Sequence, residues 1–135
     1  TDAVASKATF ERFEDTAGEH RFRLRHRNGN IIADGSDGME TAEAATDRIE
    51  RVRDVAPGAY VVDTARDEEP EEEGGSGAVF EIFEDNEQRW RWRLVDDDTV
   101  IADSGQGYAS KQGCRKGMRS VTKNCRGAPV EDVEE

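Results

Sequence analysis

Two stretches of the chain alternate large side chains with arginine, one residue at a time. The clearer stretch is Arg89-Trp90-Arg91-Trp92-Arg93-Leu94, and the fainter one is His20-Arg21-Phe22-Arg23-Leu24. Alternation with a period of two is typical of a β-strand that has one buried and one exposed face. We therefore predict that the aromatic residues of each stretch face a core and that the arginines lie on the opposite face.

The two arginine strands belong to a longer repeat. A shift of 70 residues aligns residues 10–15 with residues 80–85, and a shift of 69 aligns residues 32–34 with residues 101–103. A one-residue deletion in a turn explains the change of shift, because turns tolerate changes of length that strands do not. The chain thus contains an internal repeat of roughly 55 residues.

Each repeat has the pattern of a strand, a hairpin, an arginine strand, a turn, a third strand, a glycine-containing loop and a helix. Asn28-Gly29 is typical of a two-residue hairpin turn with positive φ angles, and residues 96–99 take its place in the second repeat. A short extended segment follows each helix, at residues 59–63 and 128–132. Pro129 restricts the second of these segments to a sheet edge or to an interrupted pairing.

The helices begin near Thr41 and Ser110, whose hydroxyls suit the N-cap position. Apolar residues at helical spacing then predict one buried stripe on each helix. The stripes are Ala45, Ile49 and Val52 in the first repeat and Cys114, Met118 and Val121 in the second.

The first strand of each repeat carries two phenylalanines three residues apart, Phe10 and Phe13 in one and Phe80 and Phe83 in the other. A regular strand points such a pair to opposite faces. Either the strand contains a bulge, or both faces of the sheet are partly covered there.

These patterns divide the chain into a first repeat (residues 1–63), a linker (residues 64–77) and a second repeat (residues 78–135). The linker holds six acids against one arginine, and these contribute −5 to the net charge. We expect it to be acidic, glycine-rich and self-repelling.

The chain is strongly acidic. The 135 residues carry a formal net charge of −12, and 37% of them are charged. Few lysines and few large aliphatic residues accompany this acidity, which favours adaptation to high salt, where acidic surfaces keep proteins hydrated and apart. On this interpretation the acidity indicates the habitat and not the binding partner.

Cys114 and Cys125 fall in one predicted helix, where eleven residues span about 16 Å, too far for a disulfide. Two free thiols favour a reducing compartment. No apolar stretch has the length of a signal-peptide core or a membrane span, so we expect a cytoplasmic protein.

The second repeat resembles the YegP-like family, tandem-repeat domains of unknown function. The matching residues are 80–85, 91–94, 101–111, 117–118, 120–121 and Asn124. The first repeat departs from them with Met39, Thr41-Ala42 and Arg48 in place of tyrosine, Ser-Lys and glycine. The resemblance implies an α+β fold of two β-β-β-α-β repeats. They would form one shared antiparallel sheet with two helices packed on it, related by a pseudo-twofold, with the C-terminal strands exchanged. It implies no catalytic residue, cofactor or substrate.

The second helix provides the first candidate site. No acid lies between Ser104 and Val130, whereas the first helix mixes acids with arginines. The hypothesis is that this basic face binds an anionic partner, either a nucleic-acid backbone or the acidic linker of the same or another molecule. The favoured interpretation is a solvated helix face. The candidate residues are Lys111, Arg115, Lys116, Arg119 and Lys123.

The arginine strands provide a secondary candidate, consisting of Arg21, Arg23, Arg91 and Arg93. They could bind single-stranded nucleic acid if aromatic side chains lay beside them. The favoured interpretation is ion pairing across strands with Glu11 and Glu81, because the alternation places the aromatic residues on the other face.

Other chemistry is less well supported. The glycine loop at residues 104–111 lacks the spacing of a phosphate-binding motif and is better explained as a turn with positive φ. Neither His20 nor His26 has a motif that links it to a nucleophile, and no metal-ligand spacing occurs. We predict no catalytic residue, no cofactor and no metal. The expected function is a non-enzymatic binding module, monomeric with an internal pseudo-dimer, for a protein partner or alternatively for nucleic acid.

Overall fold

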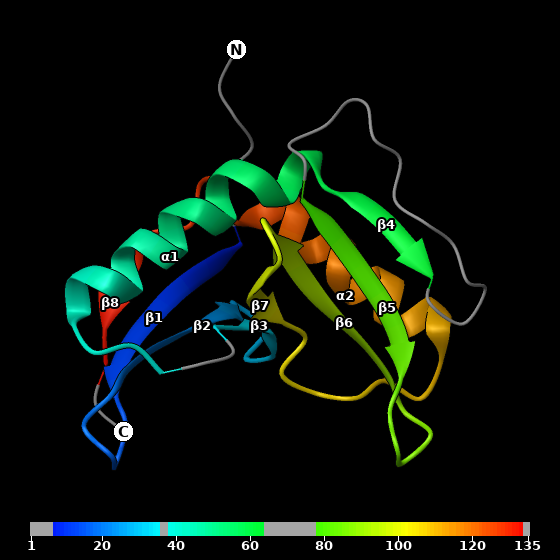
Figure 1. Ribbon diagram of the computed structural model, residues 1–135, viewed down its shortest axis with the longest axis horizontal. Helices are drawn as coiled ribbons and strands as arrows, with labels where there is room; N and C mark the ends of the chain where they lie inside the picture. The colour runs from blue at the N-terminus through cyan, green and yellow to red at the C-terminus, as the bar shows by residue number, and fades with distance from the viewer. Residues whose placement is uncertain (1–6, 36–37, 64–77, 134–135) are drawn as a thin grey trace.

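Eight strands form one sheet in the order β4-β5-β6-β7-β3-β2-β1-β8 (Figure 1). The computed structural model describes residues 7–35, 38–63 and 78–133, and the predicted linker lies outside them. The first repeat contains β1 (Ala8–Glu14), β2 (His20–His26), β3 (Ile31–Asp34), α1 (Ala42–Val55), the short 3₁₀ helix η1 (Ala56–Gly58) and β4 (Tyr60–Asp63). The second contains β5 (Val79–Glu84), β6 (Trp90–Asp96), β7 (Thr99–Asp103), α2 (Lys111–Asn124) and β8 (Val130–Asp132).

The last strand of each repeat lies in the other half of the sheet, as the family resemblance predicted. β4 pairs with β5, and β8 pairs with β1. Both of these pairings are parallel, whereas the six inner strands are antiparallel, so the predicted antiparallel sheet is in fact mixed. β4 and β5 are separated by residues 64–78, and β8 and β1 by most of the chain, so neither pair is joined by the tight hairpin that permits only antiparallel pairing.

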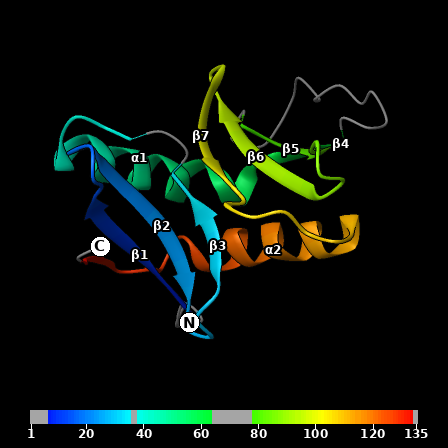
Figure 2. The ribbon, with the colours of Figure 1, turned by 90° about the horizontal axis from the view of Figure 1, so that it is seen from below.

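The two halves meet at the centre of the sheet, where Asp34 of β3 is paired with Asp103 of β7. Figure 2 shows α1 and α2 on either side of this centre, in an arrangement close to twofold symmetry. Each helix contacts strands of its own repeat and the third strand of the other, α1 reaching β7 and α2 reaching β3. The repeats therefore share one core.

The predicted alternation in the arginine strands is confirmed. Phe22, Leu24, Trp92 and Leu94 are fully buried, while the arginines between them are half-buried. Edge-to-face ring contacts join the strands of each hairpin, Phe80 with Trp92 at 5.2 Å and the equivalent phenylalanines at 6.0 Å. Such contacts stabilise a core beyond the area they bury.

The paired phenylalanines are explained by coverage of both faces. β5 pairs with β6 without a shift of register, so no bulge separates Phe80 from Phe83. Phe83 instead lies under the guanidinium of Arg93, 4.9 Å from the ring centre. Bulges occur in the third strands, where Ile32 and Ile101 have no partner across the strand and are buried.

The predicted helix starts and turns are largely correct. Thr41 and Ser110 are the N-caps, and each hydroxyl accepts a backbone amide at 3.0 Å. In the β2–β3 turn Gly29 has a positive φ, but Asn28 does not. Gly105 has a φ of +69°, as expected for a turn in the glycine loop.

Candidate functional site

An aspartate at the tip of each first hairpin fixes the first arginine of the following strand. Arg21 donates to Asp15 and Arg91 to Asp85, each from Nε to Oδ2 at 2.6 Å. The other oxygen of each carboxylate accepts two backbone amides of the turn. These hydrogen bonds, the one from arginine foremost, hold the pKa of both aspartates below the usual range.

The second arginine of each strand pairs with a glutamate across the hairpin. Arg23 donates to Glu11 at 2.7 Å and Arg93 to Glu81 at 2.6 Å, which confirms the predicted cross-strand ion pairs. Burial alone would raise the pKa of Glu11, but hydrogen bonds from Arg23 and Arg25 outweigh it and the pKa is lowered.

The arginine face also carries aromatic side chains, although not those of the arginine strands. The aromatics of these strands lie opposite the arginines as predicted, but the expectation that no aromatic lies beside the arginines is wrong. The guanidinium of Arg23 lies 4.7 Å from the ring centre of Phe13 of β1, and Arg93 covers Phe83 of β5 in the same way. Cation–π contacts of this kind need the two side chains on one face. The face of the sheet opposite the helices therefore presents arginine and phenylalanine together.

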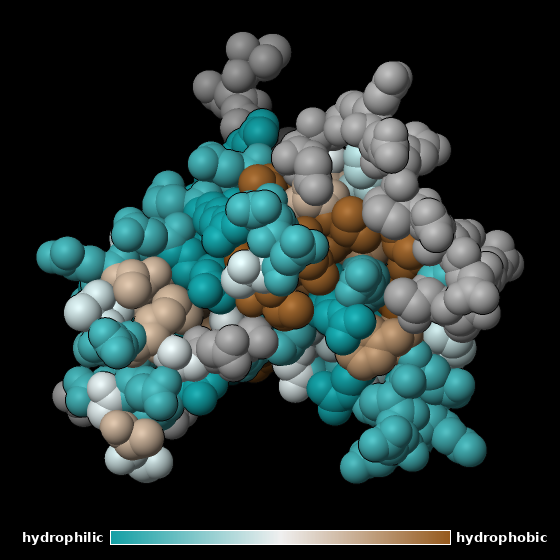
Figure 3. Space-filling model, viewed as in Figure 1, coloured by the Kyte–Doolittle hydropathy of each residue, from teal (hydrophilic) through white to brown (hydrophobic). Residues whose placement is uncertain are grey.

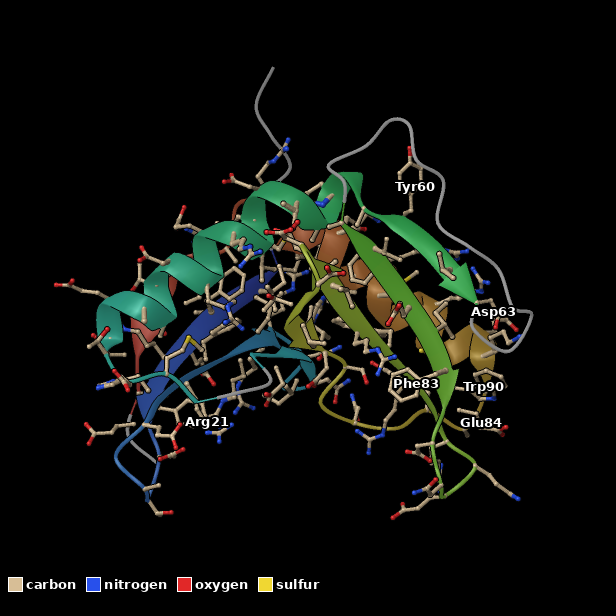
Figure 4. The ribbon with its side chains drawn as sticks, viewed as in Figure 1. Arg21, Tyr60, Asp63, Phe83, Glu84 and Trp90 are labelled. Carbon is tan, nitrogen blue, oxygen red and sulfur yellow. The ribbon has the colours of Figure 1, made fainter. Side chains whose placement is uncertain are left out.

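A cavity of about 250 Å³ lies on this face in the second repeat. Figure 4 shows Phe83 on the inner side of β5 there, and Figure 3 shows hydrophobic surface over the neighbouring strands. The cavity combines guanidinium, carboxylate and apolar groups. The lining residues are Phe83, Arg91, Trp92, Arg93, Val100, Asp103 and Ser104.

The predicted basic face of α2 divides into two parts. Lys111 donates from Nζ to Asp63 at 2.5 Å, and Arg115 lies 4.0 Å from the same carboxylate. Asp63 is fully buried at the end of β4 (Figure 4). The ammonium of Lys111 also lies 4.7 Å from the ring centre of Trp90. These two cations anchor the exchanged strand and contribute less to a binding surface.

The other part is exposed. Lys116, Arg119 and Lys123 are solvent-exposed, and their side chains make no ion pair or hydrogen bond with any residue that the structure describes. They recur at helical spacing, so they form one row on the outer side of α2, about 10 Å long. We name these three residues the basic stripe.

The arginines of α1 are used differently. Arg48 donates to the carbonyl oxygen of Val100 at 3.3 Å, and Arg51 to Asp96 at 2.6 Å. Arg53 donates to the carbonyl of Ala128. All three arginines contact the second repeat, whereas the acidic residues of α1 are exposed to solvent. The positive and negative side chains, which are mixed along the sequence of α1, therefore lie on different sides of the helix.

Asp63 is the residue that sequence reasoning missed. The signal was present, because a shift of 69 aligns Asp63 with Asp132 and each ends an exchanged strand. A buried carboxylate is costly without a partner, so its position requires the cation that Lys111 supplies.

The remaining candidates have structural roles in the described residues. His26 accepts the amide of Asn28 through Nδ1 at 3.2 Å, within the hairpin turn. Cys114 and Cys125 are free thiols, and burial raises the pKa of each to about 11. Among the described helices, none combines the length and the hydropathy that a membrane span requires.

A family model described as a domain of unknown function (DUF1508) matches the chain twice, at residues 15–63 and 85–132. The chain belongs to the DUF1508 family. Each match begins at the hairpin aspartate, Asp15 or Asp85, and ends at the aspartate of the exchanged strand, Asp63 or Asp132.

Relatives occur in tandem and single form. A UPF0339 protein from the region 5′ of the ptx operon of Stutzerimonas stutzeri is 31% identical over 125 residues, which cover 93% of this chain and 96% of that protein. A UPF0339 protein of Treponema denticola is 39% identical over 54 residues, covering 40% of this chain and 93% of that protein. A segment about the length of one repeat of this chain therefore makes up nearly all of the second relative.

Two solved structures share the fold. The protein of unknown function yegP from E. coli has a TM-score of 0.74 at 20% identity, with 98% of this chain and 97% of that chain covered. A UPF0339 protein from Shewanella oneidensis has a TM-score of 0.72 at 19% identity, with 95% and 92% covered. The three chains thus share one fold over nearly their whole length.

Proposed function

We propose that this DUF1508 protein is a small non-enzymatic binding module and that the basic stripe of α2 contacts an acidic surface of a protein partner. The observation that carries the proposal is the contrast between the helices. Every arginine of α1 is engaged within the molecule, whereas Lys116, Arg119 and Lys123 remain exposed in a chain of net charge −12. Three unpaired cations in one row favour an anionic partner.

A protein partner fits this stripe better than nucleic acid does. Single-stranded nucleic acids are bound with aromatic side chains on which bases stack, and the stripe contains none. The acidity of the whole chain also opposes a densely charged polyanion more than a locally acidic protein surface.

Nucleic acid is the second candidate, because Arg23 and Arg93 lie beside Phe13 and Phe83 on one face of the sheet. Retention on immobilised single-stranded RNA across a salt series tests it. Binding that weakens with salt and survives removal of the basic stripe would support this candidate over the first.

The test of the first candidate uses a fluorescent polyglutamate peptide as the probe. We expect the variant Lys116→Gln, Arg119→Gln, Lys123→Gln to bind it at least tenfold more weakly than the unaltered chain at low salt. The matched control is Asp47→Asn, Glu50→Gln, Asp54→Asn, which changes the equivalent positions of α1 and should not weaken binding. Equal affinity of the first variant and the unaltered chain would refute the proposal.

Adaptation to high salt is part of the same proposal. The acidic surface repels itself, and salt screens that repulsion. We expect the urea midpoint of unfolding to rise steadily between 0.1 and 3 M KCl, in steps larger than those of a near-neutral protein of similar size. A midpoint that stays constant or falls would contradict adaptation to salt.

A further inference from the structure

The positions of α1 that are equivalent to the basic stripe are all acidic. A shift of 69 residues places Lys116 on Asp47, Arg119 on Glu50 and Lys123 on Asp54. The three acids are solvent-exposed, as the three cations are. We name Asp47, Glu50 and Asp54 the acidic stripe. The charge of the outer row is therefore inverted, position by position, between the two helices.

This inversion is specific to the outer rows. Both helices keep the same apolar stripe against the sheet and begin at the same kind of N-cap. Within the acidic stripe, only Glu50 has a partner among the described residues, the neighbouring Arg53. Asp47 and Asp54 have no ion pair or hydrogen bond with any residue that the structure describes.

The two stripes match each other in length as well as in sign. Each has its charges at the same helical spacing, over about 10 Å of helix. Among the described residues, no ion pair joins the two stripes within one molecule. They can meet between two molecules, where the acidic stripe of one copy lies along the basic stripe of the next.

We propose that the partner of the basic stripe is the acidic stripe of a second copy of this chain. This inference rests on the proposed function and names the acidic surface that it requires. The contact joins two different surfaces, so it is heterologous, and a copy that binds through its α2 leaves its own α1 open to a further copy. Association of this kind continues into short chains instead of stopping at a dimer.

The association is weak and sensitive to salt. Exposed ion pairs contribute little each, and a salt concentration of 0.15 M already screens charges beyond about 8 Å. We expect a dissociation constant of roughly millimolar order at 20 mM salt and no measurable association at 1 M. The average mass of the species in solution should therefore rise with protein concentration at low salt only.

Charge reversal provides a sharp test. One variant carries Lys116→Glu, Arg119→Glu and Lys123→Glu, so both of its outer rows are acidic. A second carries Asp47→Lys, Glu50→Lys and Asp54→Lys, so both of its outer rows are basic. A third carries all six substitutions and keeps the net charge of −12. All six positions are exposed, and circular dichroism checks that each variant is folded.

Sedimentation equilibrium at low salt should show no association for either of the first two variants alone. Their equimolar mixture should associate more tightly than the unaltered chain, because either outer row of one variant is then complementary to both outer rows of the other. The third variant, with all six substitutions, should recover the association of the unaltered chain. The inference would be overturned by a mixture that stays monomeric or by a third variant that does not associate.

The polyglutamate experiment separates this inference from the proposed function. If the basic stripe binds polyglutamate while the unaltered chain stays monomeric at low salt, the second copy is the wrong partner and the binding module stands. If the stripe binds neither, both proposals fail.

Discussion

The two ends of the sheet solve one problem in different ways. Each exchanged strand ends in an aspartate that needs a cation. At one end Arg12 of β1 donates to Asp132 from Nε and Nη2, at 2.6 and 3.0 Å. At the other end Lys111 of α2 donates to Asp63. The cation that binds the aspartate of the exchanged strand thus comes from the neighbouring strand in one half and from the helix in the other.

Each repeat lacks the cation that the other repeat uses for its ion pair. Ile82 stands where Arg12 would be expected in the second repeat, and Ala42 stands where Lys111 would be expected in the first. The burial differs as well, because the side chain of Asp132 is 72% exposed and that of Asp63 is fully buried. The comparison teaches that the repeats preserve an ion pair at the exchanged strand and not the residues that form it.

The largest expected effect is the loss of the buried end. Asp63→Asn should lower the free energy of unfolding by roughly 3 kcal/mol, because it leaves Lys111 and Arg115 beside a neutral amide. Urea denaturation followed by tryptophan fluorescence measures the loss. Asp132→Asn is the matched control and should change the midpoint little, since water replaces the lost partner. Equal losses at the two ends would remove the distinction drawn here.

A second difference between the halves involves a helix glycine. In the second repeat the ring of Tyr108 lies against Gly117, and a β-carbon there would clash with its hydroxyl. Gly117→Ala should cost about 1–3 kcal/mol, although alanine favours helices more than glycine does. In a Tyr108→Met background, which copies Met39 of the first repeat, the same substitution should instead stabilise the protein. Chemical denaturation of the three variants tests the reversal of sign.

Asp15 and Asp85 should contribute equally to stability in the two hairpins, unlike the aspartates that end the two exchanged strands. The pKa values of Asp15 and Asp85 are lowered in the folded protein, so their contribution to stability is complete above the unfolded pKa, near 4. It is lost as the pH falls through the lower folded values. We therefore expect the urea concentration at the midpoint of unfolding, measured from pH 6 to pH 2, to decrease once the pH is below about 4.

Single substitutions then compare the two hairpins. Asp15→Asn and Asp85→Asn should flatten this acid dependence by similar amounts, because the hydrogen bonds of the two carboxylates are equivalent. An effect confined to one hairpin would mean that the halves differ there too.

Much of the fold could be predicted because it rests on local patterns. The alternation around Trp92, the repeat and the N-caps at Thr41 and Ser110 all depend on neighbours in the sequence. The exchange of strands came from the family resemblance. The sequence analysis missed that β4 pairs with β5, and β8 with β1, in parallel. The relative direction of two paired strands depends on how the connecting segments run and not on the local pattern of either strand.

The candidate site was less predictable, because a charged side chain takes its role from distant neighbours. Lys111 and Lys123 are alike in sequence, but only the first meets a buried carboxylate from another strand. The arginines of α1 find Val100, Asp96 and Ala128 in the other repeat. Nothing in the helical pattern of α1 indicates those contacts, so the sorting of its charges required the structure.

The pairing of β8 with β1 also bears on how the molecule is made. The amide of Phe10 donates to the carbonyl of Pro129, and Arg12 meets Asp132, so the first strand of the sheet is completed by the last. Contacts between such distant residues slow folding, because the intervening chain must first be ordered. During synthesis β1 emerges from the ribosome long before residues 130–132, and its outer edge stays open until they arrive.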